Sequence, residues 1–124
     1  MNPSFWGPHA WKFLHAIAFN YSNNIENISQ EEMLNHYYFF FFLGKVLPCP
    51  TCRESYQQFF KQIKITDFLQ KKNLDLWIYY IHHLVNKKLM KEKKIFIVEP
   101  SFSQVHNFYK QFNTPIISDC NCSL

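Results

Sequence analysis

Residues 37–43 read Tyr-Tyr-Phe-Phe-Phe-Phe-Leu, a run of large apolar side chains in the first half of the chain. The run lies in a helix that we predict from the capping box Ser29 to Glu32 until about Val46, shortly before Pro48. A helix that is apolar nearly all round has to be buried on more than one side. In so short a chain a second subunit is a natural cover, so the run predicts a homodimer that buries apolar helix faces.

The composition favours a single all-α domain. The chain has 124 residues, 48% hydrophobic and 19% aromatic, which is enough for one core and too little for a second domain. Only 2 residues are glycine, so the turn-rich composition of an all-β protein is absent. We therefore expect a small helical bundle over residues 1–114 and a flexible tail over residues 115–124.

Helix signals recur along the chain at intervals that suit such a bundle. Pro8 fits the first turn of a helix to about Asn23, and one face of that helix would carry Trp11, Leu14, His15, Ala18 and Tyr21. Further helices are expected over about residues 50–60, from the N-cap Asn73 to Met90, and from the capping box Ser101 to Gln104 until about Phe112. For residues 66–72 the sequence does not decide between a short turn and a single helical turn.

Cys49-Pro50-Thr51-Cys52 is a Cys-x-x-Cys motif at the expected start of the third helix. Pro48 and Pro50 flank the first cysteine, and proline is tolerated in the first turn of a helix. The unpaired amide donors and the positive dipole end at a helix N-terminus lower the pKa of a thiol there. This position favours a redox-active disulfide.

Two other interpretations of the motif stay open on the residues alone. In a zinc-binding interaction module, Cys49 and Cys52 would need two further ligands. The pair Cys120 and Cys122 could supply them, as could His82-His83, although neighbouring residues on one helix point about 100° apart. The two cysteines of the motif could also be inert members of the core.

The formal net charge of +4 is concentrated in lysines between residues 87 and 94. Such a run at the end of a helix is ordinarily a solvated face that complements the helix dipole. Nucleic-acid binding would need a wider basic stripe with arginines, and Arg53 is the only arginine, so we expect no nucleic-acid partner. An anionic small ligand fits the lysines better.

The sequence predicts neither an export signal nor a transmembrane segment. Residues 1–11 lack the charged leader and apolar core of a signal peptide, and the apolar run 37–43 is far shorter than the roughly 20 residues that span a bilayer. We therefore expect a cytoplasmic protein. In the cytosol structural disulfides are rare, so a Cys-x-x-Cys is more often catalytic or metal-binding.

Three segments together resemble a known family. They are Trp6-Gly7 followed by Trp11-Lys-Phe-Leu-His15, then Pro48-Cys49-Pro-Thr-Cys52, and then Trp77 with His82-His-Leu-Val-Asn86-Lys-Lys88-Leu-Met-Lys91. In order and spacing they resemble the ERV/ALR flavin-dependent sulfhydryl oxidases over residues 6–91. The chain is short, and its many Phe, Lys, Asn and Ile residues with a single arginine are the composition that an A/T-rich genome encodes. In both respects it is most similar to the family members of large cytoplasmic DNA viruses, which would place it in the host cytosol or the virion.

The resemblance implies a four-helix bundle with a short fifth helix, a homodimer, no metal, and FAD held non-covalently. The residues implied in cofactor binding are Gly7, Trp11, His15, Tyr21, His82, Asn86, Lys88 and Lys91. Of these, Trp11, His15 and Tyr21 would lie beside the flavin, while the segment from His82 to Lys91 would hold the adenine and the diphosphate. The chain departs from the family pattern at His83 and Met90, and Phe108 or Tyr109 replaces a tryptophan of the fifth helix.

The resemblance also implies a reaction. Cys52 would be the sulfur next to the flavin, and Cys49 would exchange with a protein dithiol such as a thioredoxin-like carrier, with O2 reduced to H2O2. Some family members carry a Cys-x-Cys shuttle disulfide in a mobile tail, and Cys120 and Cys122 are the candidates for that role. A thioredoxin-like reductase is not favoured, because the chain lacks the expected strand pattern.

Overall fold

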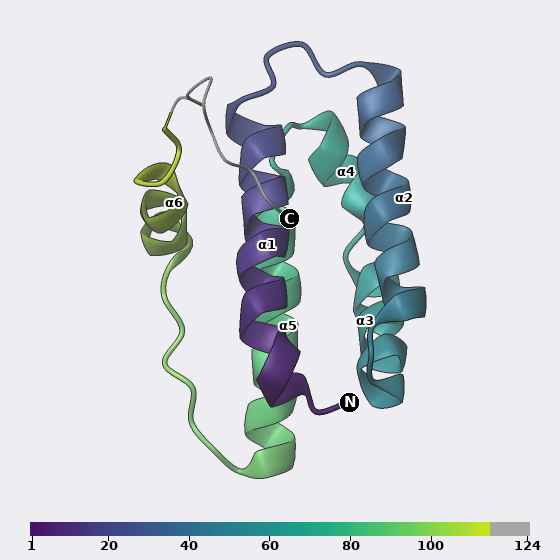
Figure 1. Cartoon of the computed structure of the whole chain (residues 1–124), viewed down its shortest axis with the longest axis vertical. Helices are drawn as coiled ribbons and strands as arrows, with labels where there is room; N and C mark the ends of the chain where they lie inside the picture. The colour runs from purple at the N-terminus through teal and green to yellow at the C-terminus, as the bar shows by residue number, and fades with distance from the viewer. Residues whose placement is uncertain (115–124) are drawn as a thin grey trace.

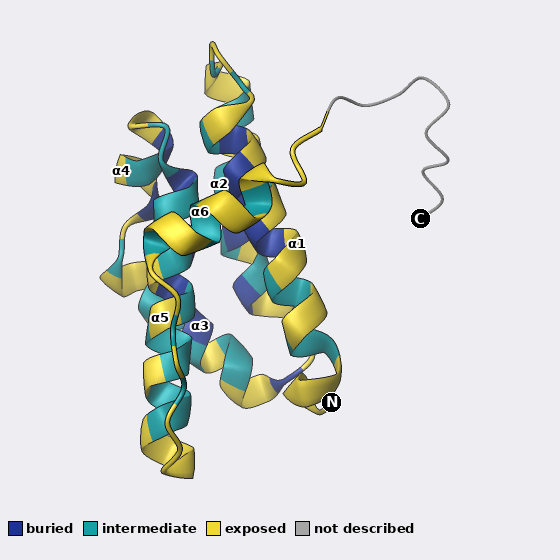
Figure 2. Ribbon diagram, turned by 90° about the vertical axis from the view of Figure 1, so that its left-hand side faces the viewer, coloured by how far each residue is buried: buried dark blue, intermediate teal, exposed yellow. Residues whose placement is uncertain are grey.

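The computed structural model describes residues 1–114, and this part of the chain contains six α-helices and no strand (Figure 1). The helices are α1 Pro3–Asn23, α2 Gln30–Val46, α3 Pro50–Gln62, α4 Ile65–Gln70, α5 Leu74–Lys93 and α6 Phe102–Lys110. The long helices α1, α2, α3 and α5 form the bundle, with α1 packed on α5 and α2 on α3. The short α6 lies against α1 after an extended segment (Figure 2). The predicted all-α bundle with a short additional helix is therefore confirmed.

Two helices begin at the capping boxes that the sequence predicts. The Ser29 hydroxyl accepts a hydrogen bond from the Glu32 amide at 3.1 Å, and α2 starts at the next residue after Ser29. Ser101 and Gln104 form both hydrogen bonds of the box and start α6. Capping links residues only three apart, so these boundaries could be predicted without tertiary contacts.

The first helix begins at Pro3, and the expectation that it starts at Pro8 was wrong. Asn2 is the N-cap, because its side-chain oxygen accepts from the Ser4 amide at 3.0 Å. Pro3 then takes the first helical position, where its missing N–H costs nothing. Pro8 lies inside the helix, little more than one turn further on, so it removes a single hydrogen bond near the start of the helix.

Three helix boundaries differ in smaller ways from the sequence pattern. Residues 66–72, which could be a turn or a helical turn, contribute to the short helix α4, Ile65–Gln70. Helix α5 continues past the expected Met90 to Lys93, where Lys94 ends it in the left-handed region at φ 52°. Helix α6 ends at Lys110, short of the expected Phe112. None of the helices in residues 1–114 has an apolar stretch of the length that a membrane span requires.

The core is organised around Trp77 of α5, whose side chain has no exposed surface. Its ring packs edge-to-face on Phe40 of α2 at 5.1 Å and on Phe60 of α3 at 6.0 Å between centroids. Its indole N–H donates to the Ile63 carbonyl at the end of α3, at 2.9 Å. One side chain therefore ties α5 to both members of the α2–α3 pair.

Buried tyrosines add hydrogen bonds between helices. Tyr21 of α1 donates to the Leu69 carbonyl of α4 at 2.7 Å, and Tyr56 of α3 donates to the Phe40 carbonyl of α2 at 2.6 Å. Burial raises the pKa of both phenols, so each stays a protonated donor. These bonds satisfy polar atoms that would otherwise be costly in the core.

Helix α2 buries little of its apolar surface within this chain. Only Phe40 and Gly44 are buried, whereas five large apolar side chains are exposed: Leu34, Tyr38, Phe39, Phe42 and Val46. We call these five side chains the α2 apolar stripe. Its exposure is what the sequence predicts for a helix that needs cover beyond its own chain.

The close contact between α2 and α3 gives a testable prediction for Gly44. An added Cβ at Gly44 would lie 2.8 Å from Cδ1 of Tyr56, and the Tyr56 ring cannot swing away because its hydroxyl is bonded to the Phe40 carbonyl. We expect Gly44→Ala to lower the free energy of unfolding by roughly 1–3 kcal/mol. At Gly7 an added Cβ meets nothing within 4 Å, so Gly7→Ala is the matched control and should not destabilise the fold. Equal denaturation midpoints for the two variants would contradict this account of the helix contact.

Candidate active site

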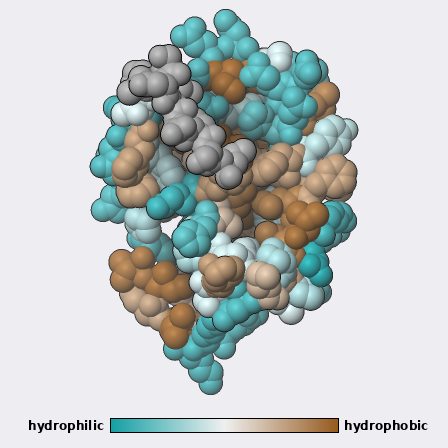
Figure 3. All heavy atoms as spheres, viewed as in Figure 1, coloured by the Kyte–Doolittle hydropathy of each residue, from teal (hydrophilic) through white to brown (hydrophobic). Residues whose placement is uncertain are grey.

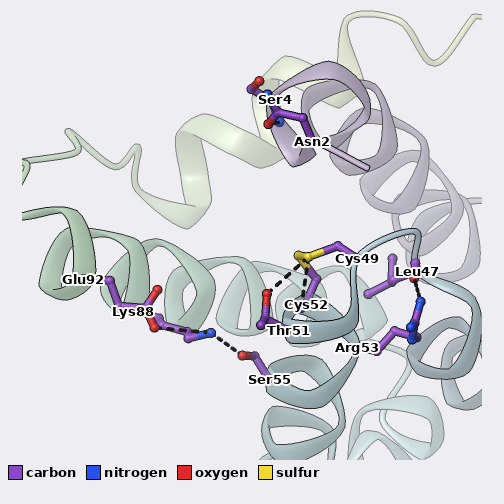
Figure 4. The surroundings of a disulfide bond; sticks show 10 residues. All are labelled: Asn2, Ser4, Leu47, Cys49, Thr51, Cys52, Arg53, Ser55, Lys88 and Glu92. Atoms are coloured by element: carbon purple, nitrogen blue, oxygen red, sulfur yellow. Dashed lines mark hydrogen bonds and ion pairs between the residues drawn. A yellow bond between two sulfur atoms is a disulfide. The ribbon is translucent and has the colours of Figure 1, made fainter.

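The two cysteines of the Cys-x-x-Cys motif form a disulfide at the start of α3, as Figure 4 shows. Cys49 is the N-cap of the helix and Cys52 lies in its first turn, with 5.2 Å between their Cα atoms. Cys49 is 8% exposed, while Cys52 is half-buried. The predicted helix start at Pro50 is confirmed, and it places both sulfurs at the positive end of the α3 dipole.

Two donors approach the Cys49 sulfur. The amide N–H of Cys52 donates to it at 3.3 Å, and the Thr51 hydroxyl lies at the same distance (Figure 4). Arg53 donates to the Leu47 carbonyl and so holds the residues that lead into the motif. When the disulfide opens, these donors and the helix dipole favour a negative charge on the Cys49 sulfur.

The described residues do not assemble a zinc site. The disulfide engages both sulfurs of the motif, and within residues 1–114 no three His, Cys, Asp or Glu side chains gather closely enough to hold a metal ion. His82 and His83, the possible partners in the zinc interpretation, diverge to different neighbours. Cys120 and Cys122 lie outside the described residues.

A groove of about 810 Å³ opens between α1, α5 and α6. Trp11 of α1 stacks on His82 of α5 with 3.8 Å between ring centroids and 6° between planes. His15 Nε2 shares a hydrogen bond with His82 Nδ1 at 3.0 Å, and the His15 ring stacks on Tyr109 of α6 at 5.5 Å. We call this space the histidine groove. It brings together Trp11, His15 and His82, which the sequence predicted as cofactor residues.

Burial keeps His15 and His82 in the groove neutral. Burial, together with the nearby His82, lowers the pKa of His15 to about 3. It lowers the pKa of His82 to about 4, although the Glu99 carboxylate acts in the opposite direction. At neutral pH one ring therefore donates to the other, and the floor of the groove is aromatic and uncharged.

Glu99 closes the outer side of the groove and was not predicted from the sequence. Its carboxylate pairs with Nδ1 of His83 at 2.9 Å and accepts from the Asn86 amide at 3.1 Å. Asn86, a predicted cofactor residue, therefore lines the groove from α5. Glu99 lies in the extended segment between α5 and α6. Apolar side chains gather on this part of the surface, at the lower left of Figure 3. A segment without regular secondary structure has no periodic pattern that would show which of its side chains line a groove. The sequence therefore offered no signal for Glu99.

The other predicted cofactor residues do not line this groove. Tyr21 lies fully buried in the core, and Gly7 lies upstream on α1. Lys88 donates to the Ser55 hydroxyl of α3 and pairs with Glu92 at 3.4 Å (Figure 4). Lys91 is exposed on α5. Ser55 is one turn beyond Cys52, so Lys88 joins α5 to the helix that carries the disulfide.

Comparison with known proteins places the chain in a family. The model of the Erv1 / Alr family matches residues 8–112, which include both the disulfide and the histidine groove. A protein of Acanthamoeba polyphaga mimivirus, named as a probable FAD-linked sulfhydryl oxidase, is 36% identical over 88 residues, or 69% of this chain. Those residues are 59% of the viral protein, so the chain spans less than two thirds of the length of that relative. The family match confirms the resemblance read from the three sequence segments, and the chain belongs to the Erv1/Alr family.

Proposed function

We propose that this protein is an FAD-dependent sulfhydryl oxidase that forms disulfides in protein dithiols and passes the electrons to O2, giving H2O2. The observation that carries the proposal is the Cys49–Cys52 disulfide at the N-terminus of α3, in a small domain that also holds the aromatic histidine groove. Membership of the Erv1/Alr family and the name of the mimivirus relative support it.

The histidine groove fits the cofactor that this function needs. Its volume of about 810 Å³ lies in the upper part of the range for cofactor sites. Trp11 packs on His82 and His15 on Tyr109, so the groove is lined by paired aromatic rings, a surface that suits contact with a planar ring system. Asn86 supplies an amide at the rim. When bound, FAD would supply the two-electron acceptor; the roles of Gly7, Tyr21, Lys88 and Lys91 toward it stay predictions.

The disulfide supports a thiol exchange carried by Cys49. A substrate thiolate attacks the Cys49 sulfur, the Cys49–Cys52 bond breaks, and Cys52 leaves as a thiolate. The second substrate thiolate then attacks the substrate sulfur of the mixed disulfide and releases Cys49 as a thiolate. The Thr51 hydroxyl and the Cys52 amide stabilise that leaving group, so this second step is favoured. The substrate is oxidised by two electrons, and the cysteine pair is reduced by two.

We expect Cys49→Ala and Cys52→Ala each to abolish oxidation of a small dithiol such as dithiothreitol, while FAD stays bound in both. The reason is that each variant loses the disulfide, whereas the groove side chains are untouched. O2 consumption measures turnover, and flavin absorbance after gel filtration measures retention. Loss of flavin from both variants, with circular dichroism unchanged, would contradict the separation of the sulfur pair from the cofactor groove.

We also propose that the protein is a homodimer that covers the α2 apolar stripe. The five exposed side chains of that stripe lie on one helix, and apolar patches of this kind mark interfaces. Light scattering at micromolar concentration should give twice the monomer mass, and Phe42→Glu should give the monomer mass. Phe96→Glu is the matched control, because Phe96 is 85% exposed on the segment between α5 and α6. A monomeric unmodified protein would refute the dimer.

Cys120 and Cys122 are proposed as a shuttle disulfide that passes electrons from a protein substrate, such as a thioredoxin-like carrier, to Cys49. A disulfide that closes so small a ring exchanges readily, and a tether raises its effective concentration. The double variant Cys120→Ser with Cys122→Ser should keep small-dithiol oxidation. Oxidation of a reduced protein should slow by at least roughly tenfold, about 1.4 kcal/mol in the barrier. Equal rate changes on both substrates would count against a shuttle.

The cytoplasmic location expected from the sequence stays a prediction.

A further inference from the structure

A second groove, of about 560 Å³, lies between α2, α3 and α4 and takes no part in the site described above. Its floor is aromatic. Tyr37 stacks on Phe41 of α2 at 6.1 Å between centroids, and Phe60 of α3 packs edge-on against both rings at 5.9 Å. We call it the lysine groove, because three lysines line it and no acidic residue does: Lys45, Lys61 and Lys64.

The walls of the lysine groove are held by hydrogen bonds inside the protein. The Gln57 amide donates to the Gly44 carbonyl at 2.8 Å, and the Tyr56 hydroxyl donates to the Phe40 carbonyl. Lys45 lies 5.6 Å above the Phe41 ring and also donates to Gln57. The groove therefore exists before anything binds, which lowers the cost of ordering a ligand.

The charges of the groove select an acidic occupant. Lys61 and Lys64 are exposed and form no hydrogen bond or ion pair with other residues of the described range 1–114. A second copy of this chain is disfavoured there, because it carries a net charge of +4 itself. The groove-facing residues Tyr37 and Phe41 also point about 100° away from their neighbours Tyr38 and Phe42 in the α2 apolar stripe.

The position of the groove relates it to the disulfide. Lys45 precedes Cys49 by four residues at the end of α2, and Gln57 follows Cys49 by eight residues along α3. At 1.5 Å per residue, Gln57 lies about 12 Å from the disulfide along the helix axis and Lys61 about 18 Å. An extended peptide covers about 3.3 Å per residue, so roughly four to six residues span this distance.

We propose that the lysine groove docks an acidic and aromatic segment of the protein substrate, about four to six residues from the cysteine that reacts with Cys49. The aromatic side chain would lie on Tyr37, Phe41 and Phe60, and the flanking carboxylates would pair with the lysines. This inference rests on the proposed oxidase function and specifies its substrate class. Since Cys49 is only 8% exposed, docking at a distance would help to aim an extended segment at it.

Three peptides with the same Cys-x-x-Cys pair test the proposal on the flavin-loaded protein. They carry Glu-Phe-Glu, Lys-Phe-Lys or Gln-Ala-Gln five residues from the pair, and dithiothreitol serves as a substrate without a docking segment. We expect kcat/KM for the Glu-Phe-Glu peptide to exceed that for the Lys-Phe-Lys peptide by at least tenfold, mainly through KM. Equal values for the three peptides would overturn the proposal.

Charge-reversal variants localise the effect. Lys61→Glu with Lys64→Glu should raise KM for the Glu-Phe-Glu peptide at least tenfold, with kcat and dithiothreitol oxidation unchanged. Lys93→Glu with Lys110→Glu changes the net charge equally at exposed sites outside both grooves and should leave this KM unchanged. The same loss in both double variants would mean general attraction to a basic protein and would overturn docking at this groove.

A binding measurement separates the groove from the chemistry. The Glu-Phe-Glu peptide with both cysteines replaced by serine is titrated by fluorescence anisotropy against the unmodified protein and the two double variants. Binding that is lost in Lys61→Glu with Lys64→Glu and kept in the control supports the groove, even if no oxidation of dithiothreitol were found. Failure to oxidise dithiothreitol would refute the oxidase function, whereas absence of peptide binding would refute the groove alone.

Discussion

The packing of Trp77 is the contact on which the rest of this structure depends. The Trp77 side chain is completely buried and contacts Phe40 and Phe60, and its indole N–H donates to the carbonyl at the end of α3. These contacts hold α5 against the α2–α3 pair, while another face of α5 packs on α1. The same helix can therefore present His82 to the histidine groove and Lys88 to α3, five and eleven residues further on. A shift of α5 would disturb both the groove and the support of the disulfide helix.

The chemistry is divided between two environments with opposite electrostatics. At the start of α3 the helix dipole, the Cys52 amide and the Thr51 hydroxyl favour negative charge on sulfur. In the histidine groove burial removes charge, so His15 and His82 are neutral rings that share one hydrogen bond. The first environment suits thiol exchange, and the second suits the uncharged, planar ring system of a cofactor. The lysine groove adds a third, cationic surface beside the same helix α3.

Several residues named from the sequence have roles that only packing explains. The Tyr21 hydroxyl donates to the carbonyl of Leu69 in α4, which is 48 residues further along the chain. Lys88 donates to the Ser55 hydroxyl because α3 lies within reach of that face of α5, and its expected place at a diphosphate stays a prediction. Helix α4 itself depends on Ile65 and Leu69 entering the core, which a six-residue segment cannot signal by periodicity.

The sequence by itself determined the helical class, the starts of α2, α3 and α6, and the place of the cysteine pair. Those features depend on residues two to four apart, such as Ser29 with Glu32 or Cys49 with Cys52, whose geometry the local backbone sets. The tertiary structure alone decided which side chains meet across the bundle. His15 and His82 are 67 residues apart, and Glu99 reaches Asn86 from a segment without regular structure. Such contacts exist only after α1 and α5 have packed, because no periodic pattern encodes the distance between two helices.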